Sequence, residues 1–249
     1  MNSQPVDLAT LTASPQQRRA ALVVIVMLGA LALGTAPFAQ YFVGTFPGFV
    51  MLYGGVVLTG LAITTTILFG QYAVSRKPSL LTLACGTLFT SVVFVPYLLT
   101  FPGVGAENVI GAFPGTASYL WIVWHSALPV AFLAYPLIEA RTRTREVASG
   151  PTTGAVVASV VAAYAAIHVV LAFSDVLPPL VRNDQYSLAI EIVFALVALC
   201  SAAALLLLLR RAGGTVLDAW LSVPAAALLF EAVINGFGGG RYTVGWYLS

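Results

Sequence analysis

Charge is the scarcest property of this chain. Only 8% of its 249 residues are Asp, Glu, Lys or Arg, whereas 59% are hydrophobic. A soluble globular domain carries about a quarter charged residues, so this composition excludes an ordinary water-soluble domain. Most of the chain must instead be surrounded by lipid.

Lysine, histidine and cysteine are also rare. The one lysine, Lys77, lies between two apolar stretches, which excludes a retinal Schiff base inside a span. Two histidines and two cysteines at different depths are too few for a zinc site, which needs three or four converging ligands. Cys85 and Cys200 also differ in depth, so we expect no disulfide between them. We therefore expect no metal and no cofactor, and no enzyme activity, because no Ser, His and Asp set shares one depth.

Seven apolar stretches are long enough to cross a bilayer, which takes about 20 apolar residues in a helix. They are residues 20–38, 49–74, 79–101, 118–138, 153–173, 187–209 and 217–235. An eighth begins near Tyr242. We predict an all-α polytopic transmembrane helix bundle with seven full spans and the start of an eighth. The polar residues 1–19 are predicted to be a cytosolic tail, and 20–249 a single membrane domain.

The basic residues are distributed unevenly among the loops. Nine of the eleven precede the first stretch or follow the second, fourth and sixth: Arg18, Arg19, Arg76, Lys77, Arg141, Arg143, Arg145, Arg210 and Arg211. Because Lys and Arg are retained on the cytoplasmic side of short loops, we expect a multi-pass protein of the bacterial inner membrane with its N-terminus in the cytoplasm. This bias also explains the net charge of +2, so the expected partner is the lipid bilayer and not a nucleic acid.

The polar groups that could carry chemistry all fall in the outer half of the predicted bundle. They are Tyr97, His125, His168, Glu191 and Glu231, with Arg182 and Arg241 just above them. Such groups are costly in lipid and usually face the bundle interior. One interpretation is an outward-opening pocket that binds a small ligand or senses protons, a task that suits histidine. The other is structural hydrogen bonding, with Glu231 or Glu191 paired to Arg241 or Arg182.

Two other classes of function remain open. In a small proton-coupled transporter, Glu191, Glu231 and His168 would relay protons. In a haem or redox membrane protein, His125 and His168 would ligate a haem between adjacent helices. The chain has no further histidines from which a series of redox centres could be built.

Four segments carry a resemblance to a known family. They are ILFGQYAVSRKPSLLTLACGTLFTS, YLLTFPG, SYLWIVWHSALPV, and DAWLSVPAAALLF followed by RYTVGWY. Their order, spacing and topology resemble the membrane-associated sensor domain of the MASE type, fourth family. The resemblance covers residues from about 49 to 249.

This resemblance implies an eight-helix bacterial inner-membrane sensor that usually precedes a GGDEF diguanylate cyclase domain and sometimes a histidine kinase. Its shared residues fall here on Trp124 and His125, on Thr100, Phe101 and Pro102, and on Arg241 with Gly245, Trp246 and Tyr247. Trp124 therefore joins the ligand-sensing candidates. Tyr97 stands where a histidine is expected, which weakens a metal or haem site. No GGDEF-like string occurs in the chain. We therefore expect a homodimeric input module, truncated inside its last helix, whose cytosolic output domain is absent.

Overall fold

The computed structural model describes residues 10–46, 48–104, 113, 115–142, 152–211 and 214–249. Helices dominate these ranges, with one short hairpin. The elements are α1 (Pro15–Thr35), the 3-10 helix η1 (Ala36–Phe38), α2 (Phe49–Ser75), α3 (Pro78–Thr100), α4 (Thr116–Thr142), α5 (Thr152–Phe173), β1 (Val181–Arg182), β2 (Gln185–Tyr186), α6 (Leu188–Arg210), α7 (Val216–Gly238) and α8 (Val244–Leu248). The seven long helices α1–α7 are long and apolar enough to cross a membrane, which confirms the predicted all-α bundle.

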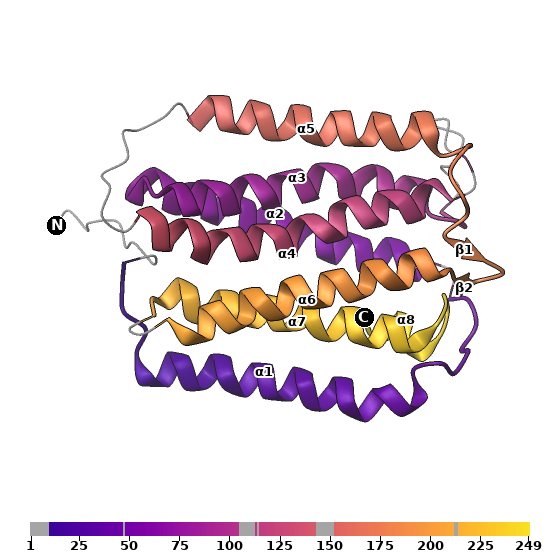
Figure 1. The fold of residues 1–249 in the computed structure, drawn as a ribbon, viewed down its shortest axis with the longest axis horizontal. Coiled ribbons are helices and arrows are strands. Elements are labelled where there is room, and N and C mark those ends of the chain that lie inside the picture. The colour runs from indigo at the N-terminus through magenta and orange to yellow at the C-terminus, as the bar shows by residue number, and fades with distance from the viewer. Residues whose placement is uncertain (1–9, 47, 105–112, 114, 143–151, 212–213) are drawn as a thin grey trace.

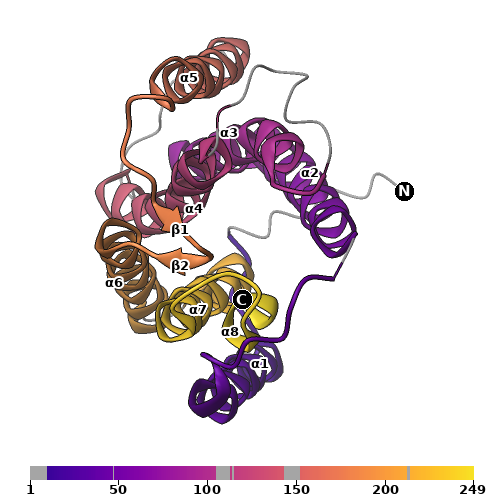
Figure 2. The same ribbon diagram turned by 90° about the vertical axis from the view of Figure 1, so that its right-hand side faces the viewer.

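The seven long helices run side by side along the long axis of the molecule (Figure 1). Seen end-on, α2, α3, α4, α6, α7 and α1 follow one another in an open arc, and α5 packs outside it against α3 and α4 (Figure 2). The short helix α8 turns back along the end of α7, on the inner side of the arc. Both α8 and the β1–β2 hairpin lie at the same end of the bundle (Figure 1).

The first helix begins five residues earlier than the predicted span, at Pro15 rather than residue 20. Ser14 explains this start, because its hydroxyl accepts a hydrogen bond from the Gln17 backbone while the Gln17 side chain accepts one from the Ser14 backbone. Such a capping box satisfies amide groups that have no partner inside the helix. Residues 10–19 of the predicted tail are described, with 15–19 inside α1, and residues 1–9 lie outside the described part.

One end of the bundle, which we call the basic end, gathers several of the described basic side chains. Lys77 pairs with Glu139 at 2.8 Å, and Arg211 pairs with Asp218 at 3.4 Å. Arg18 donates to the Gly214 carbonyl at 3.4 Å. The spans thus alternate as the charge bias predicts, with the start of α1 and the ends of α2, α4 and α6 at the same end of the bundle. We call the opposite end, with the hairpin and α8, the pocket end.

Apolar packing differs along the bundle axis. Towards the basic end, a continuous apolar cluster joins α2, α3, α4, α6 and α7 and includes the buried Leu80, Leu83 and Tyr135. Towards the pocket end, a second cluster joins α2, α3, α4 and α5. Large apolar side chains also point outward, such as Leu33, which is 78% exposed. Lipid solvates such side chains as well as the core does, so helix association here depends on close packing.

Candidate functional site

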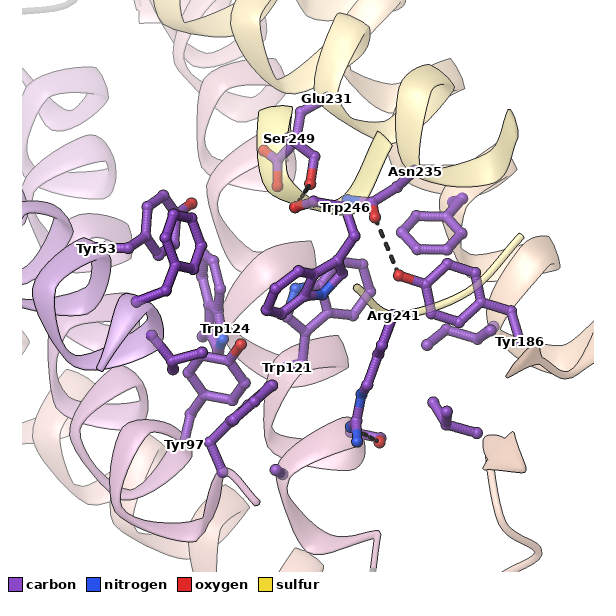
Figure 3. A pocket seen from close by; sticks show the side chains of 18 residues that line it. Tyr53, Tyr97, Trp121, Trp124, Tyr186, Glu231, Asn235, Arg241, Trp246 and Ser249 are labelled. Carbon is purple, nitrogen blue, oxygen red and sulfur yellow. Dashed lines mark hydrogen bonds between the residues drawn. The ribbon is translucent and has the colours of Figure 1, made fainter. Parts of the chain in front are cut away.

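A pocket of about 700 Å³, including its open mouth, lies inside the arc at the pocket end (Figure 3). Its walls come from α2, α3, α4, α6, α7, the hairpin and the C-terminal segment. The lining residues are Phe49, Val50, Tyr53, Tyr97, Phe101, Ala117, Ser118, Trp121, Trp124, Val181, Tyr186, Ile190, Phe194, Glu231, Asn235, Arg241, Trp246 and Ser249. Half of them are aromatic, and Glu231 and Arg241 are the two acidic or basic residues among them. Concave, mainly apolar pockets with a few polar groups are typical of small-molecule sites.

A tight turn after α7 brings Arg241 to the pocket. Gly239 ends the helix in the left-handed conformation with φ +68°, which glycine adopts without strain. The next residue, Gly240, packs so closely on the Asp184 carbonyl that a side chain there would collide with it. The Arg241 amide donates to that same carbonyl at 2.7 Å. The hairpin thereby fixes where the arginine leaves the turn.

The C-terminal segment forms one wall of the pocket. Thr243 caps α8 by accepting a hydrogen bond from the Trp246 amide. The Trp246 ring packs on Phe49 of α2 and Phe101 at the end of α3, with ring centroids 5.8 and 6.0 Å apart. Tyr247 donates to the Gly44 carbonyl at 2.7 Å. The α8 helix is therefore held from both sides of the arc, by the loop before α2 and by α7.

Aromatic rings from α3 and α4 form the opposite wall. Trp121 stacks on His125 with ring centroids 4.2 Å apart, and Trp124 contacts Tyr97 at 5.6 Å and Phe94 at 4.8 Å. The spacing of Trp121, Trp124 and His125 along α4 puts them on neighbouring positions of one helix face. They are therefore held as one aromatic layer.

The His125 side chain of this layer meets Glu231 of α7. The His125 Nε2 atom lies 3.6 Å from Oε1 of Glu231. His125 is fully buried, and neither of its ring nitrogens has a hydrogen-bond partner within the described ranges. The Glu231 side chain is 18% exposed, and it lines the pocket. The pair thus joins α4 to α7 and presents a carboxyl group to the cavity.

Two further polar groups are anchored near the mouth. Arg241 donates from Nη2 to the Ser118 hydroxyl at 3.0 Å, and its guanidinium lies 5.1 Å from the Phe101 ring centroid. Tyr186 donates to the Asn235 side-chain oxygen at 3.1 Å. Burial raises the pKa of Tyr186, which keeps its hydroxyl protonated as a donor. These contacts connect the hairpin, α4 and α7 around the opening.

The structure brings together five of the eight residues predicted as ligand-sensing candidates. Four of them line the pocket, namely Tyr97, Trp124, Glu231 and Arg241, and His125 contacts Glu231. The other three, His168, Glu191 and Arg182, are exposed and lie outside the lining set.

His168 turns its Nδ1 towards the Tyr164 carbonyl of its own helix, at 2.9 Å. Among the described residues, neither Glu231 nor Glu191 forms an ion pair with Arg241 or Arg182. Within the same ranges, no three His, Cys, Asp or Glu side chains converge as a metal site would require.

Sequence reasoning did not select several lining residues, above all Tyr53, Trp121, Tyr186, Asn235 and Trp246. Trp121 stood inside a family-like segment without a role, and Trp246 was one of the family's shared residues without being a ligand-sensing candidate. A usable signal was the concentration of Trp and Tyr near the predicted outer ends of the spans. Aromatic residues are common at membrane interfaces, however, so that signal does not by itself distinguish a pocket.

Comparison with known families identifies a model that covers most of the chain. The model described as "membrane-associated sensor, integral membrane domain", MASE4, matches residues 44–249. The chain belongs to the MASE4 family. This confirms the resemblance drawn from the four sequence segments and makes the chain an integral membrane sensor domain. The matched range contains every residue that lines the pocket of this MASE4 domain. Comparisons with curated proteins and with solved structures find no match.

Proposed function

We propose that this chain is the sensory input module of a bacterial signalling protein, and that it regulates a cytosolic diguanylate cyclase or histidine kinase. In this proposal it lies in the inner membrane as a homodimer with its N-terminus in the cytoplasm. A small ligand or a proton reaches the pocket from the periplasmic side. The module itself catalyses no reaction, and its output is a change in the position of α8.

The observation that carries this proposal is the double role of the C-terminal segment. Arg241, Trp246 and Ser249 line the pocket, and α8 directs the chain back from the pocket end towards the basic end. A ligand that fills the pocket therefore lies against a wall to which the C-terminal segment contributes three side chains. Figure 3 shows Ser249 beside Glu231, so the end of α8 lies next to the buried carboxyl group.

A sensor needs two arrangements to which its stimulus binds unequally. In the arrangement described here, α8 is tied both to the loop before α2 and to α7, so a second arrangement would have to exchange some of these contacts. Gly245 approaches α7 so closely that a Cβ atom there would lie 2.8 Å from the Ile234 carbonyl oxygen. A ligand that pushes on Trp246 would shift α8 along this surface. The pocket and the position of α8 would then be coupled, because the C-terminal segment forms part of the pocket wall.

The structure favours a sensor over the proton-coupled transporter. A transporter needs a polar path from Glu231 and His125 to the other face of the membrane. In the part of the chain that the structure describes, the space towards the basic end is filled by the apolar cluster around Leu80, Leu83 and Tyr135. The haem alternative gains no support either, since His168 is exposed on α5 and does not line the pocket.

The proposal is tested by joining a diguanylate cyclase domain in frame after Ser249 and measuring cyclic di-GMP in cells that lack other cyclases. Gly245→Ala and Trp246→Ala alter the α8 contacts, and Glu231→Gln alters the pocket. We expect each to change the cyclic di-GMP level by severalfold at equal protein abundance. Trp220→Ala is the matched control, because Trp220 is exposed near the basic end.

If the three pocket and α8 variants give the cyclic di-GMP level of the parent, the α8 route is wrong. The α8 route is also wrong if the cyclic di-GMP level changes only in proportion to the amount of protein. Stability of each variant is followed separately by the thermal unfolding of the purified protein, so that a folding defect is not read as a signal.

A further inference from the structure

We propose that the pocket binds a small organic cation, a quaternary ammonium or a protonated amine, with its positive charge against Glu231 and its substituents against the surrounding aromatic rings. This proposal rests on the sensory role proposed above and names the chemical class of its stimulus. Three observations carry it: the position of Glu231, the rings around the cavity, and the contacts already made by Arg241.

Glu231 is a carboxyl group deep in the domain with little to neutralise it. It precedes the last residue of α7, Gly238, by seven positions, which at 1.5 Å per residue puts it about 10 Å from that end of the helix. Its one recorded partner in the described ranges is His125, at 3.6 Å, too far for a normal hydrogen bond. The ionised form of such a carboxyl group is costly inside a membrane protein unless a positive charge lies nearby, and a bound cation would supply one.

The aromatic rings supply the second half of a cation site. A cation is attracted to the faces of Trp, Tyr and Phe rings, most strongly to Trp. Trp121, Trp124 and Trp246 line the cavity together with Tyr53 and Tyr97. Figure 3 shows Tyr53, Trp121, Trp124 and Trp246 around the space that Glu231 faces. A quaternary ammonium, which carries its charge on an apolar surface, suits such a lining better than a hydrated metal ion.

Arg241 argues for a cation rather than an anion as the main ligand. Its guanidinium already donates to Ser118 at 3.0 Å and lies over the Phe101 ring. Figure 3 shows this guanidinium on the opposite side of the cavity from Glu231. Arg241 therefore makes no ion pair with Glu231 inside the described site. A ligand held by Arg241 instead would be an anion, and the experiment below distinguishes the two.

Binding of a cation should depend on pH, because only the deprotonated form of Glu231 attracts it. Affinity is expected to fall as the pH is lowered and Glu231 takes up a proton. The titratable and charged groups that face Glu231 from the neighbouring elements are His125, Tyr53, Tyr97, Tyr186 and Arg241. Protonation of His125 would act in the same direction, since it adds a competing positive charge.

The tryptophans make the pocket observable without a label. Three of the four tryptophans of the chain line it, and the fourth, Trp220, is exposed on the first turns of α7. The full chain carrying Trp220→Phe would be purified in nanodiscs and its tryptophan fluorescence titrated with choline. Two probes of nearly the same shape serve as controls. One is 3,3-dimethylbutan-1-ol (dimethylbutanol), in which an uncharged carbon replaces the nitrogen. The other is the carboxylate 3,3-dimethylbutanoate, which carries a negative charge.

We expect a saturable fluorescence change with choline, and affinity weaker by about tenfold or more for dimethylbutanol. Glu231→Gln should weaken choline binding by a similar factor, and Glu231→Asp, which keeps the charge, should retain part of the affinity. Glu191→Gln is the matched control, because Glu191 is an exposed carboxylate on the first turn of α6 and lies outside the pocket. It should bind choline as the parent does.

The proposal is overturned if choline and dimethylbutanol bind equally or not at all, or if Glu231→Gln leaves choline binding unchanged. If 3,3-dimethylbutanoate binds more tightly than choline and this binding is lost in Arg241→Gln, the pocket is an anion site instead. The sensory role is judged separately by the cyclase fusion. A fusion that responds to pocket substitutions without choline binding refutes only the ligand class, whereas choline binding without any change in output refutes only the sensory role.

Discussion

A close approach between the helices α3 and α4 offers a sharp test of the packing that positions the pocket. Gly86 on α3 faces Ala131 on α4, and a Cβ atom built on Gly86 would lie 2.5 Å from the Ala131 Cβ. Carbon atoms in contact lie about 3.5–4.0 Å apart, so Gly86→Ala would force the two helices apart by about 1 Å at this level. Ala131 has no flexible end that could move away.

The change in the free energy of unfolding caused by Gly86→Ala follows from two opposing effects. Overpacking of a close contact costs about 1–3 kcal/mol. Replacing glycine by alanine inside a helix gains up to about 1 kcal/mol, because the unfolded chain loses freedom. Gly60→Ala isolates this gain, since Gly60 lies on α2 with nothing within 4 Å of the position of its Cβ. Gly86→Ala should therefore be about 1–3 kcal/mol less stable than Gly60→Ala.

Thermal unfolding of the purified variants, followed by scanning fluorimetry, measures this difference. At about 2–4 °C per kcal/mol, Gly86→Ala should melt about 2–12 °C below Gly60→Ala. Adding Ala131→Gly to Gly86→Ala restores the space and should recover most of that loss. The two substitutions would then be coupled, as residues in contact are.

Equal melting temperatures for Gly86→Ala and Gly60→Ala would refute the close contact between α3 and α4. The same conclusion follows if Ala131→Gly lowers the stability of the parent and of Gly86→Ala by the same amount. In either case α3 and α4 would lie farther apart than in this structure. The contact between Tyr97 on α3 and Trp124 on α4 would then not be supported.

Two further predictions concern the basic end. Asp218 accepts a hydrogen bond from the Thr215 amide at the start of α7 and pairs with Arg211. Asp218→Ala should therefore cost about 1–2 kcal/mol of stability and lower the melting temperature. Asp175→Ala, at an exposed position, should leave the melting temperature unchanged. Alkaline phosphatase joined after Thr142 should be inactive and joined after Asp175 active, because the charge bias places the first point in the cytoplasm; the reverse pattern would contradict the orientation.

Much of the fold follows from the sequence because the constraint is severe. Backbone polar groups must be paired inside lipid, so each long apolar stretch must be a helix. The stretches at 49–74 and 79–101 therefore became α2 and α3 with ends shifted by at most one residue. The first helix was less predictable, since its start depends on a capping box at Ser14 rather than on hydropathy.

The site was predictable only in part, and the reason lies in the solvent. In water, an amphipathic pattern shows which face of a helix is buried. In lipid, the outward face is as apolar as the inward one, so the sequence of α5 does not reveal that His168 is exposed. The same ambiguity on α6 concealed that Glu191 points away from the pocket while Phe194 lines it.

The amino-acid sequence by itself determined that the helices are surrounded by lipid, how many spans there are and at which end the basic residues gather. It also determined the depth of Glu231 and His125. Those properties depend on composition and on position along each helix. Only the tertiary structure decided which side chains share a cavity, because the curvature of the arc and the turn at Gly239 bring α2, α4, α7 and α8 together across long distances in the chain. A residue's depth is set by its own span, whereas its neighbours are set by how all the helices pack.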